Sequence, residues 1–348
     1  MYVKALSESP GMHPDTSVNL LAQTTPLAQP SRRSLLGNAL VFAAAYAGSP
    51  WLMAAEPQPQ DEVWLDATRS REVPALVRWP MGKPLGVVVF SHGLGGRRTG
   101  ADVWGGAWMQ AGFVVVHLQH AGSDNVSLKG GFSALRKAMA PEQLVARVAD
   151  MKFAVDEIMR RHADSASAWA QVPVQKLAVA GHSFGARTVQ ALAGQAFPKA
   201  GSWSGADKRI KAFIALSPGL GKDVTPTQAL ADAKGMVRPM CIVSGSLDGE
   251  VLNNGETPAS RRMVYDSLPA GAKALLWLDG ADHLTFAGIE KQVPSNFLLR
   301  REKSTMEAEG SHHRHVAAVT TAWLKEQLLA QPMGTPTGLG GTDVWLRG

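Results

Sequence analysis

The stretch Leu177-Ala178-Val179-Ala180-Gly181-His182-Ser183-Phe184-Gly185 decides the fold of this 348-residue chain. Its first four residues have the apolar pattern of a short buried strand, and a helical pattern follows over residues 186–196. Between them the sequence fits G-x-S-x-G, in which a serine lies on a sharp strand-to-helix turn that lifts its oxygen above a sheet. A five-residue pattern of this kind also occurs by chance. Here a strand precedes it and a helix follows it, which is the setting that the motif requires. We therefore predict that Ser183 is a nucleophile.

The same alternation of apolar runs and helical patterns extends along the chain from Val63 onward. Residues 85–90 form a continuous apolar run, as in parallel strands that helices cover on both faces. A helix is expected to open at Pro141, a favoured first-turn residue. This alternation predicts an α/β fold with a mostly parallel central sheet, helices on both faces and right-handed crossovers. The other expected strands cover residues 73–79, 113–118, 177–180, 212–216, 241–243 and 274–278, and further helices include Trp104 with Trp108 and residues 316–329.

A serine at its ordinary pKa is a poor nucleophile and needs a base within hydrogen-bond reach. With this kind of serine turn, the chain order is serine, acid, histidine. His283 is the histidine that follows the last expected strand of the sheet, so we predict that it is the base.

The acid that orients the histidine is expected after the preceding strand, where Asp248 stands. Glu250 is a weaker alternative, and Asp282 is badly placed to bond the ring of its sequence neighbour His283.

An oxyanion formed at Ser183 needs preorganised donors. One is expected to be the backbone N–H of Phe184, and the other comes from the loop after an early strand, here Ser91-His92-Gly93-Leu94-Gly95-Gly96. We place the second donor at the Leu94 N–H, with Gly95 as the alternative.

Other residues near these motifs have weaker signals. His120 follows a strand, and with Gly95 it is expected to line the mouth of the substrate pocket. The His182 side chain is expected to point away from the nucleophile. Residues 122–140 are expected to shape or cover the pocket, or to be a plain connector.

A group of three histidines, His312, His313 and His315, lacks a matching set of Cys or carboxylate ligands. We therefore expect a solvated surface there, with no metal and no cofactor.

The composition limits the classes of binding partner that are expected. The chain is 45% hydrophobic and 18% charged, which indicates a globular protein. Its formal net charge of +6 favours peripheral contact with anionic surfaces. No Lys/Arg run with interleaved aromatics supports nucleic-acid binding. The single cysteine, Cys241, cannot form an internal disulfide. We expect a monomer.

The N-terminal region has the pattern of an export signal. Ser31-Arg32-Arg33-Ser34-Leu35-Leu36 resembles the twin-arginine motif, and a moderate apolar stretch follows it. We expect a signal region over residues 1–55, a catalytic domain over 60–330, a flexible tail over 331–348, and a periplasmic or extracellular location. The alternatives are a cytoplasmic enzyme with a chance Arg-Arg pair, and docking of Val344-Trp345-Leu346 on the domain.

With these motifs in place, the chain resembles the α/β-hydrolase superfamily over residues 73–329. Phe90-Ser91-His92-Gly93-Leu94-Gly95 and Gly181-His182-Ser183-Phe184-Gly185 resemble the dienelactone-hydrolase-like and platelet-activating-factor-acetylhydrolase-like branch. The acetylhydrolases carry their acid after the next strand, where this chain has Leu216-Ser217-Pro218, and true dienelactone hydrolases use cysteine in place of Ser183. Gly245-Ser246-Leu247-Asp248 and Gly280-Ala281-Asp282-His283 instead resemble the acid and histidine loops of cutinase-like polyester hydrolases.

These patterns together predict a serine hydrolase that cleaves carboxylic esters through an acyl-enzyme, acting on a small-molecule or lipid-like substrate. An amidase or peptidase of the same fold is the first alternative, because the same three residues serve both reactions. A non-catalytic binding protein on this fold is the second.

Overall fold

The computed structural model describes residues 58–198, 203–250, 255–271, 273–289 and 301–348. The expected signal region, residues 1–55, lies outside the described residues. In the described part, one nine-stranded sheet runs in the order β1-β2-β4-β3-β5-β6-β7-β8-β9. The strands are β1 (Gln60–Asp66), β2 (Arg71–Arg78), β3 (Gly86–Ser91), β4 (Phe113–Leu118), β5 (Leu177–His182), β6 (Ala212–Leu216), β7 (Met240–Leu247), β8 (Lys273–Asp282) and β9 (Val344–Arg347).

The six central strands, from β4 to β8, are parallel, and β1, β2 and β9 pair antiparallel at the two edges. The mostly parallel sheet predicted from the sequence is therefore confirmed. The helices are α2 (Asp102–Gln110), α3 (Gly131–Ala138), α4 (Pro141–Ala163), α5 (Phe184–Ala193), α6 (Pro226–Ala233), α7 (Pro258–Ser267) and α8 (Lys303–Leu329), with short 3-10 turns at Ser127–Gly130, Ala168–Gln171 and Thr285–Ala287.

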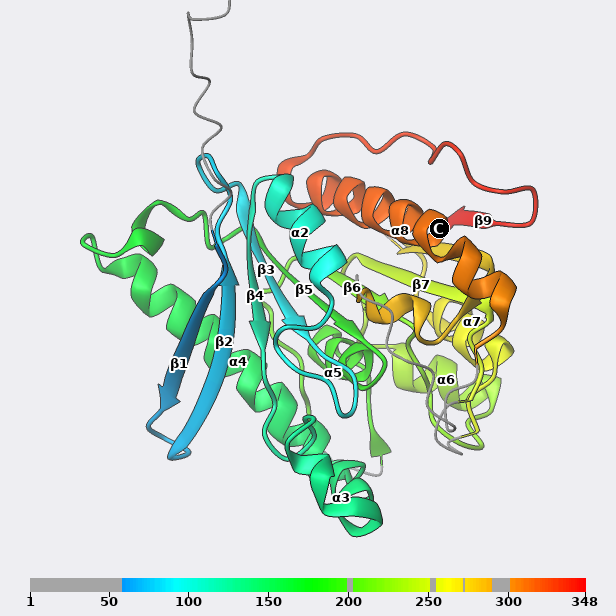
Figure 1. Cartoon of the computed structure of the whole chain (residues 1–348), viewed down its shortest axis with the longest axis horizontal. Helices are drawn as coiled ribbons and strands as arrows, with labels where there is room; N and C mark the ends of the chain where they lie inside the picture. The colour runs from blue at the N-terminus through cyan, green and yellow to red at the C-terminus, as the bar shows by residue number, and fades with distance from the viewer. Residues whose placement is uncertain (1–57, 199–202, 251–254, 272, 290–300) are drawn as a thin grey trace, which may run out of the picture. The chain divides into compact units, whose positions relative to one another are not determined.

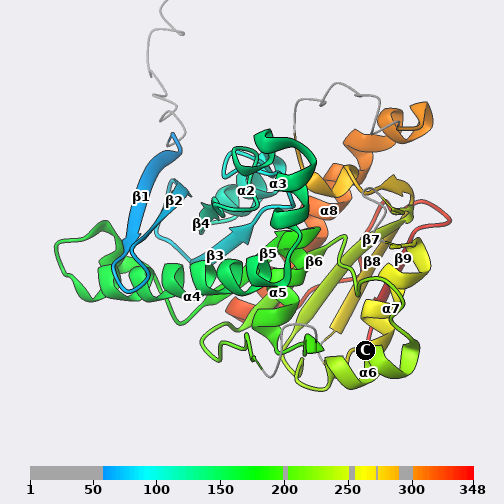
Figure 2. The ribbon, with the colours of Figure 1, turned by 90° about the horizontal axis from the view of Figure 1, so that it is seen from below.

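The sheet has a hydrophobic core on each face because successive side chains of a strand point to opposite faces. Val87 and Val89 belong to one core, with side chains of α4, α5, α6 and α7. Val88 and Phe90 belong to the other, with side chains of α2 and α8. Figures 1 and 2 show these helices on the two sides of the sheet. Burial on both faces explains why the central strands are continuous apolar runs.

Two expectations for the C-terminal part need correction. The tail was expected to be flexible, but Val344–Arg347 form β9 and pair with β8 from Ala274 to Trp277. This pairing covers an edge that would otherwise expose unpaired backbone groups, so the docking alternative holds for these residues.

The last helix also begins earlier than residue 316, at Lys303. Its first half is too polar to show an apolar stripe, and polar contacts hold it instead. Thr305 Oγ1 donates to the Gly280 carbonyl at 2.9 Å, and His312 Nε2 lies 3.1 Å from the Asp279 carbonyl.

Parallel strands end at the same edge of a sheet. The loops that follow β3, β5, β6, β7 and β8 therefore meet at one carboxyl edge, the usual position of binding crevices in open α/β sheets.

Candidate active site

Ser183 occupies the turn between β5 and α5. Its backbone has φ 56° and ψ −116°, outside both the strand and the helix regions. A Cβ at Gly185 would lie 1.9 Å from the Ser91 carbonyl oxygen, and one at Gly181 would lie 2.4 Å from the Gly185 oxygen. Only glycine fits at both positions, so the two glycines let α5 pack against β3 while the turn presents Ser183 at the carboxyl edge.

Ser183, His283 and Asp248 lie in three different loops and form one chain of hydrogen bonds. His283 Nε2 is 2.9 Å from Ser183 Oγ, and His283 Nδ1 is 3.0 Å from Asp248 Oδ1. Asp248 is fully buried, whereas the His283 ring keeps a small exposed edge. The structure therefore brings together the three residues that the sequence assigned to these roles.

Asp248 is held as a carboxylate. Burial raises its pKa, but hydrogen bonding from His283 and the charge of Arg261 outweigh this effect, and the net pKa is lowered. Ser244 Oγ donates to Oδ2 at 2.7 Å, and Arg261 Nε lies 2.7 Å from Oδ1. An ionised Asp248 keeps the proton of His283 on Nδ1, which leaves the lone pair of Nε2 directed at Ser183.

Ser217 is a functional candidate that the sequence reasoning missed. It follows β6, is fully buried and has a positive φ of 50°. Its hydroxyl donates to Asp248 Oδ1 at 2.8 Å and lies 2.7 Å from His283 Nδ1. The available signal was its position, because the acetylhydrolase resemblance places an acid there and this chain has a hydroxyl.

The alternative acids are bound elsewhere. Glu250 is exposed and accepts a hydrogen bond from the Gly255 N–H at 2.8 Å. Asp282 accepts from Arg301 Nε at 2.7 Å and from the Thr285 N–H at 2.9 Å. Neither carboxylate bonds to the His283 ring.

His182 has a structural position, whereas His120 lies elsewhere than the sequence indicated. The His182 ring packs 4.9 Å from the His283 ring, centroid to centroid, and its Nε2 lies 3.0 Å from the His283 carbonyl, so it supports the histidine loop. His120 was expected at the pocket mouth but has no exposed surface. Its ring lies between Ser91 Oγ, at 2.9 Å, and Asp150 Oδ2, at 3.1 Å. A polar network beneath the early loop draws it inward.

Phe184 and Leu94 line a small cavity beside Ser183, with a volume of about 110 Å³. Phe184 is the first residue of α5, so its N–H has no acceptor within its own helix. The Gly95 N–H is already donated to the Ser123 carbonyl at 2.9 Å, and Gly95 is not among the lining residues. The Leu94 N–H has no such backbone acceptor among the described residues. The geometry therefore favours Leu94 over Gly95 as the second donor.

A larger cavity of about 660 Å³ adjoins the small one and shares Met139, Phe184 and Arg187 with it. Arg187 lies one helical turn after Ser183 on α5. Met139 and Ala140 come from the end of the segment that was expected to shape or cover the pocket, and they form part of the wall. This cavity offers room for the acyl or alcohol part of a substrate.

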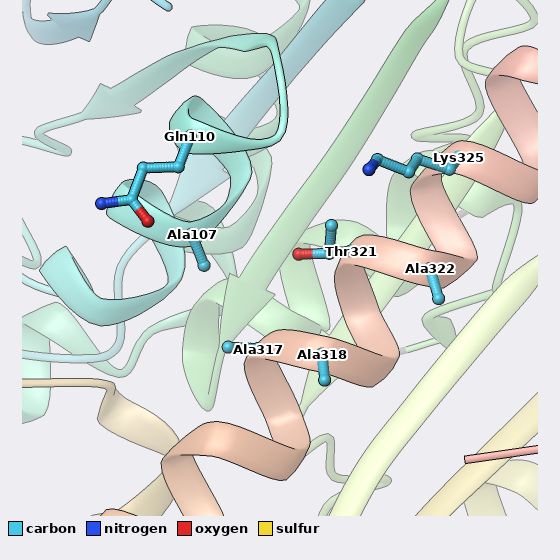
Figure 3. Close-up of a pocket in the computed structure, with 7 residues that line it drawn as sticks. All are labelled: Ala107, Gln110, Ala317, Ala318, Thr321, Ala322 and Lys325. Carbon is cyan, nitrogen blue, oxygen red and sulfur yellow. The ribbon is translucent and has the colours of Figure 1, made fainter. Parts of the chain in front are cut away.

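A third hollow lies between α2 and α8 (Figure 3). Its volume is about 370 Å³, and small alanine side chains form most of its lining. The polar side chains in it are Gln110, Thr321 and Lys325, and no histidine or carboxylate lines it. It therefore offers no acid–base chemistry comparable to that at Ser183.

The described residues lack the side-chain patterns that a metal site or a membrane-spanning helix requires. No group of three His, Cys, Asp or Glu side chains there is arranged to hold a metal ion. No helix in the same residues has the length and apolarity needed to cross a membrane.

Comparisons with known proteins give structural matches. Neither the protein-family models nor the curated protein sequences match this chain. Among solved structures, a dienelactone hydrolase from Anabaena variabilis matches with a TM-score of 0.50 and 17% identity over 78% of this chain and 100% of that one. A 2,6-dihydroxy-pseudo-oxynicotine hydrolase matches with a TM-score of 0.52 and 14% identity over 82% of this chain and 72% of the other. These likenesses show that the chain has the α/β-hydrolase fold.

Proposed function

We propose that this protein is a serine hydrolase that cleaves carboxylic esters through an acyl-enzyme. The observation that carries the proposal is the hydrogen-bond chain from Ser183 Oγ through His283 to the buried Asp248. The small cavity beside Ser183, lined by Phe184 and Leu94, supports it, because backbone amides there suit an oxyanion hole.

The reaction proceeds in two steps. Ser183 Oγ adds to the ester carbonyl carbon while His283 Nε2 takes the hydroxyl proton, and the carbonyl oxygen becomes an oxyanion held by the Phe184 and Leu94 amides. The bond to the alcohol breaks, and His283 returns its proton to the departing oxygen. Water then attacks the acyl-enzyme, His283 takes a proton from it, and the carboxylic acid leaves as Ser183 regains its hydrogen.

The test is hydrolysis of p-nitrophenyl esters from acetate to laurate by the full chain, beside its Ser183→Ala variant. We expect turnover that the variant loses, and the preferred acyl length will report the size of the acyl pocket. A parallel p-nitroanilide series addresses the amidase alternative, because anilide turnover above ester turnover would favour an amidase. The absence of any Ser183-dependent turnover would favour a binding role.

Export is a second proposal, and it rests on the Arg32-Arg33 pair and the apolar stretch after it. Fusion of residues 1–58 to a reporter is expected to direct the reporter out of the bacterial cytoplasm. Lysine at both arginine positions should block this export, and unchanged export would contradict a twin-arginine signal.

A further inference from the structure

Arg147, on α4, is a buried arginine behind the early loop that contains Leu94. It is 1% exposed and is among the largest fully buried side chains of the described part. A buried charge is costly unless it is paired, so its retention needs a reason.

The contacts of Arg147 join two parts of the site. Nη1 donates to the His92 carbonyl at 2.9 Å, and Nη2 reaches the same oxygen. The guanidinium carbon lies 4.5 Å from the centre of the Phe184 ring. One side chain therefore contacts the residue that donates one amide to the small cavity and the loop that donates the other.

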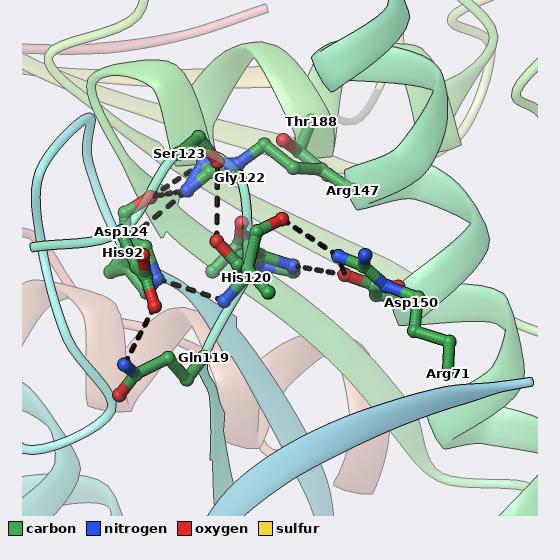
Figure 4. A network of polar contacts seen from close by, with 12 residues as sticks. Arg71, His92, Gln119, His120, Gly122, Ser123, Asp124, Arg147, Asp150 and Thr188 are labelled. Atoms are coloured by element: carbon green, nitrogen blue, oxygen red, sulfur yellow. Dashed lines mark hydrogen bonds and ion pairs between the residues drawn. The ribbon is translucent and has the colours of Figure 1, made fainter. Parts of the chain in front are cut away.

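The charge of Arg147 has no carboxylate partner among the described residues. Asp150, three residues further along α4, is the nearest acid on the helix, but it is occupied by other groups. Arg69 Nη1 and Arg71 Nε each lie 2.8 Å from Asp150 Oδ1, and His120 Nδ1 lies 3.1 Å from Oδ2. Figure 4 shows Arg71 and His120 converging on Asp150, while the Arg147 side chain passes above His120 and reaches toward His92. Arg147 therefore forms no ion pair among the described residues, and the charges of Asp150 and Asp124 act on it only from a distance.

His92 is neutral, so its imidazole adds no second positive charge to the loop. The backbone N–H of His120 donates to Nε2 of His92 at 3.1 Å. This makes Nε2 of His92 an acceptor and leaves the proton of the neutral His92 ring on its Nδ1. Nδ1 then donates to the Gly93 carbonyl at 2.6 Å, and Arg147 Nη2 lies 3.1 Å from the same nitrogen. Burial lowers the pKa of His92 well below its usual range, and the Arg147 charge acts in the same direction. These bonds fix the backbone immediately before Leu94.

Arg147 itself stays charged at neutral pH. Burial lowers its pKa to about 9, while the charges of Asp150 and Asp124 oppose that shift.

We propose that Arg147 is a positioning residue of the oxyanion hole, which fixes the Leu94 loop against Phe184 and supplies a positive charge that favours the oxyanion. This inference rests on the proposed ester hydrolysis. A buried charge that lowers the stability of the fold can still raise kcat, because a preorganised charge acts strongly on a transition state in a site that excludes water.

The test uses Arg147→Met, which keeps most of the volume without the charge, and Arg147→Lys, which keeps the charge without the forked donors. For the preferred p-nitrophenyl ester, Arg147→Met should lower kcat about 10- to 100-fold with KM within about threefold, less than or equal to the effect of losing one oxyanion donor. Arg147→Lys should recover part of that loss.

A trifluoromethyl ketone analogue of the substrate adds a readout that a purely structural role would not move. Ser183 Oγ adds to its carbonyl carbon, His283 takes the proton, and the ketone oxygen becomes an oxyanion in the hole. Its inhibition constant should rise in Arg147→Met by the same factor as kcat falls, while that of the matching unfluorinated ketone changes little.

Arg161→Met is the matched control. Arg161 lies on the same helix, about 21 Å further along the axis. It also stacks on an aromatic ring, Trp64, at 5.0 Å. Its kcat should stay within about twofold of wild type. If Arg147→Met does not fold, Phe184→Leu, which keeps the amide and removes the ring under the guanidinium, should lower kcat with the same rise in the trifluoromethyl ketone constant.

Three results would overturn the inference. The first is an Arg147→Met kcat within twofold of wild type. The second is a loss confined to KM or to stability, and the third is an unchanged trifluoromethyl ketone constant in the folded variants. Turnover lost in Ser183→Ala but unaffected by Arg147 would leave the proposed function standing, whereas wild type without Ser183-dependent turnover would remove both.

Discussion

Two buried arginines lie behind the two halves of the site, and they are bound in different ways. Arg261, on α7, donates to the carbonyls of Asp248, at 2.7 Å, and Pro218, at 2.9 Å, and its Nε also lies 2.7 Å from the Asp248 carboxylate. Arg147 donates to the His92 carbonyl and has no carboxylate partner in the described part of the chain. Both arginines donate hydrogen bonds to backbone carbonyls, but of the two only Arg261 forms an ion pair among the described residues.

This difference separates two roles for a buried cation. On the acid side, the charge pair holds Asp248 ionised and orients His283. On the oxyanion side, Arg147 has no ion-pair partner among the described residues, so its positive charge can stabilise the oxyanion that forms only during the reaction. Loss of Arg261 should therefore lower both stability and kcat, whereas loss of Arg147 should act mainly on kcat.

The largest effect is expected for the base that both halves serve. His283→Ala should lower kcat by on the order of 10⁶, because Ser183 then has no group to take its proton. Ester hydrolysis under saturating substrate measures this loss. A variant that keeps more than about 1% of wild-type kcat would mean that another group acts as the base.

Asp248→Asn should lower kcat by on the order of 10⁴, because an amide stabilises the wrong tautomer of His283 and cannot balance the imidazolium. Asp282→Asn is the matched control, since Asp282 adjoins His283 in sequence but is paired with Arg301. The control should retain activity within about tenfold. If the two variants exchanged these outcomes, the acid would be Asp282.

Unfolding by urea sharpens the comparison of the arginines. Arg261→Met leaves the buried Asp248 without its cation and should cost about 3 to 5 kcal/mol. Arg147→Met removes an unpaired charge and leaves only the His92 carbonyl short of a donor, for about 1 to 3 kcal/mol. Equal losses in the two variants would show that the pairing difference has no energetic meaning.

The smallest effect is expected for Ser217→Ala. The lost hydrogen bond to a charged carboxylate should reduce kcat about tenfold. Ionised Asp248 then has one hydrogen-bond donor fewer to stabilise it. The acid limb of the kcat–pH profile should therefore also move toward higher pH. Ser246→Ala, whose hydroxyl bonds to Asp279 instead, is the control and should leave the profile unchanged.

The sequence predicts those features of the fold and the site that produce a local pattern of residues. The parallel strands are visible as apolar runs because both of their faces are buried, and the serine turn is visible because only glycine fits on either side of it. The order of strands and loops then predicts roles for His283 and Asp248 from the sequence alone.

Residues that act through tertiary contacts leave no such pattern. Arg147 lies on the buried face of an ordinary amphipathic helix, and nothing local marks it as the clamp of a loop 55 residues away. His120 has the sequence position of a pocket residue, but Ser91 and Asp150 draw it inside. The strand β9 is too short to be identified without the open edge of β8 that it covers.

Labelling with a fluorophosphonate tests the central claim, an activated Ser183, most directly. The full chain is incubated with the probe, which loses fluoride as Ser183 Oγ bonds to phosphorus, and the adduct is located by peptide mass spectrometry. We predict one adduct per chain, on Ser183, in wild type, and none in His283→Ala. A wild-type chain without an adduct, or with its adduct on another residue, would contradict the account.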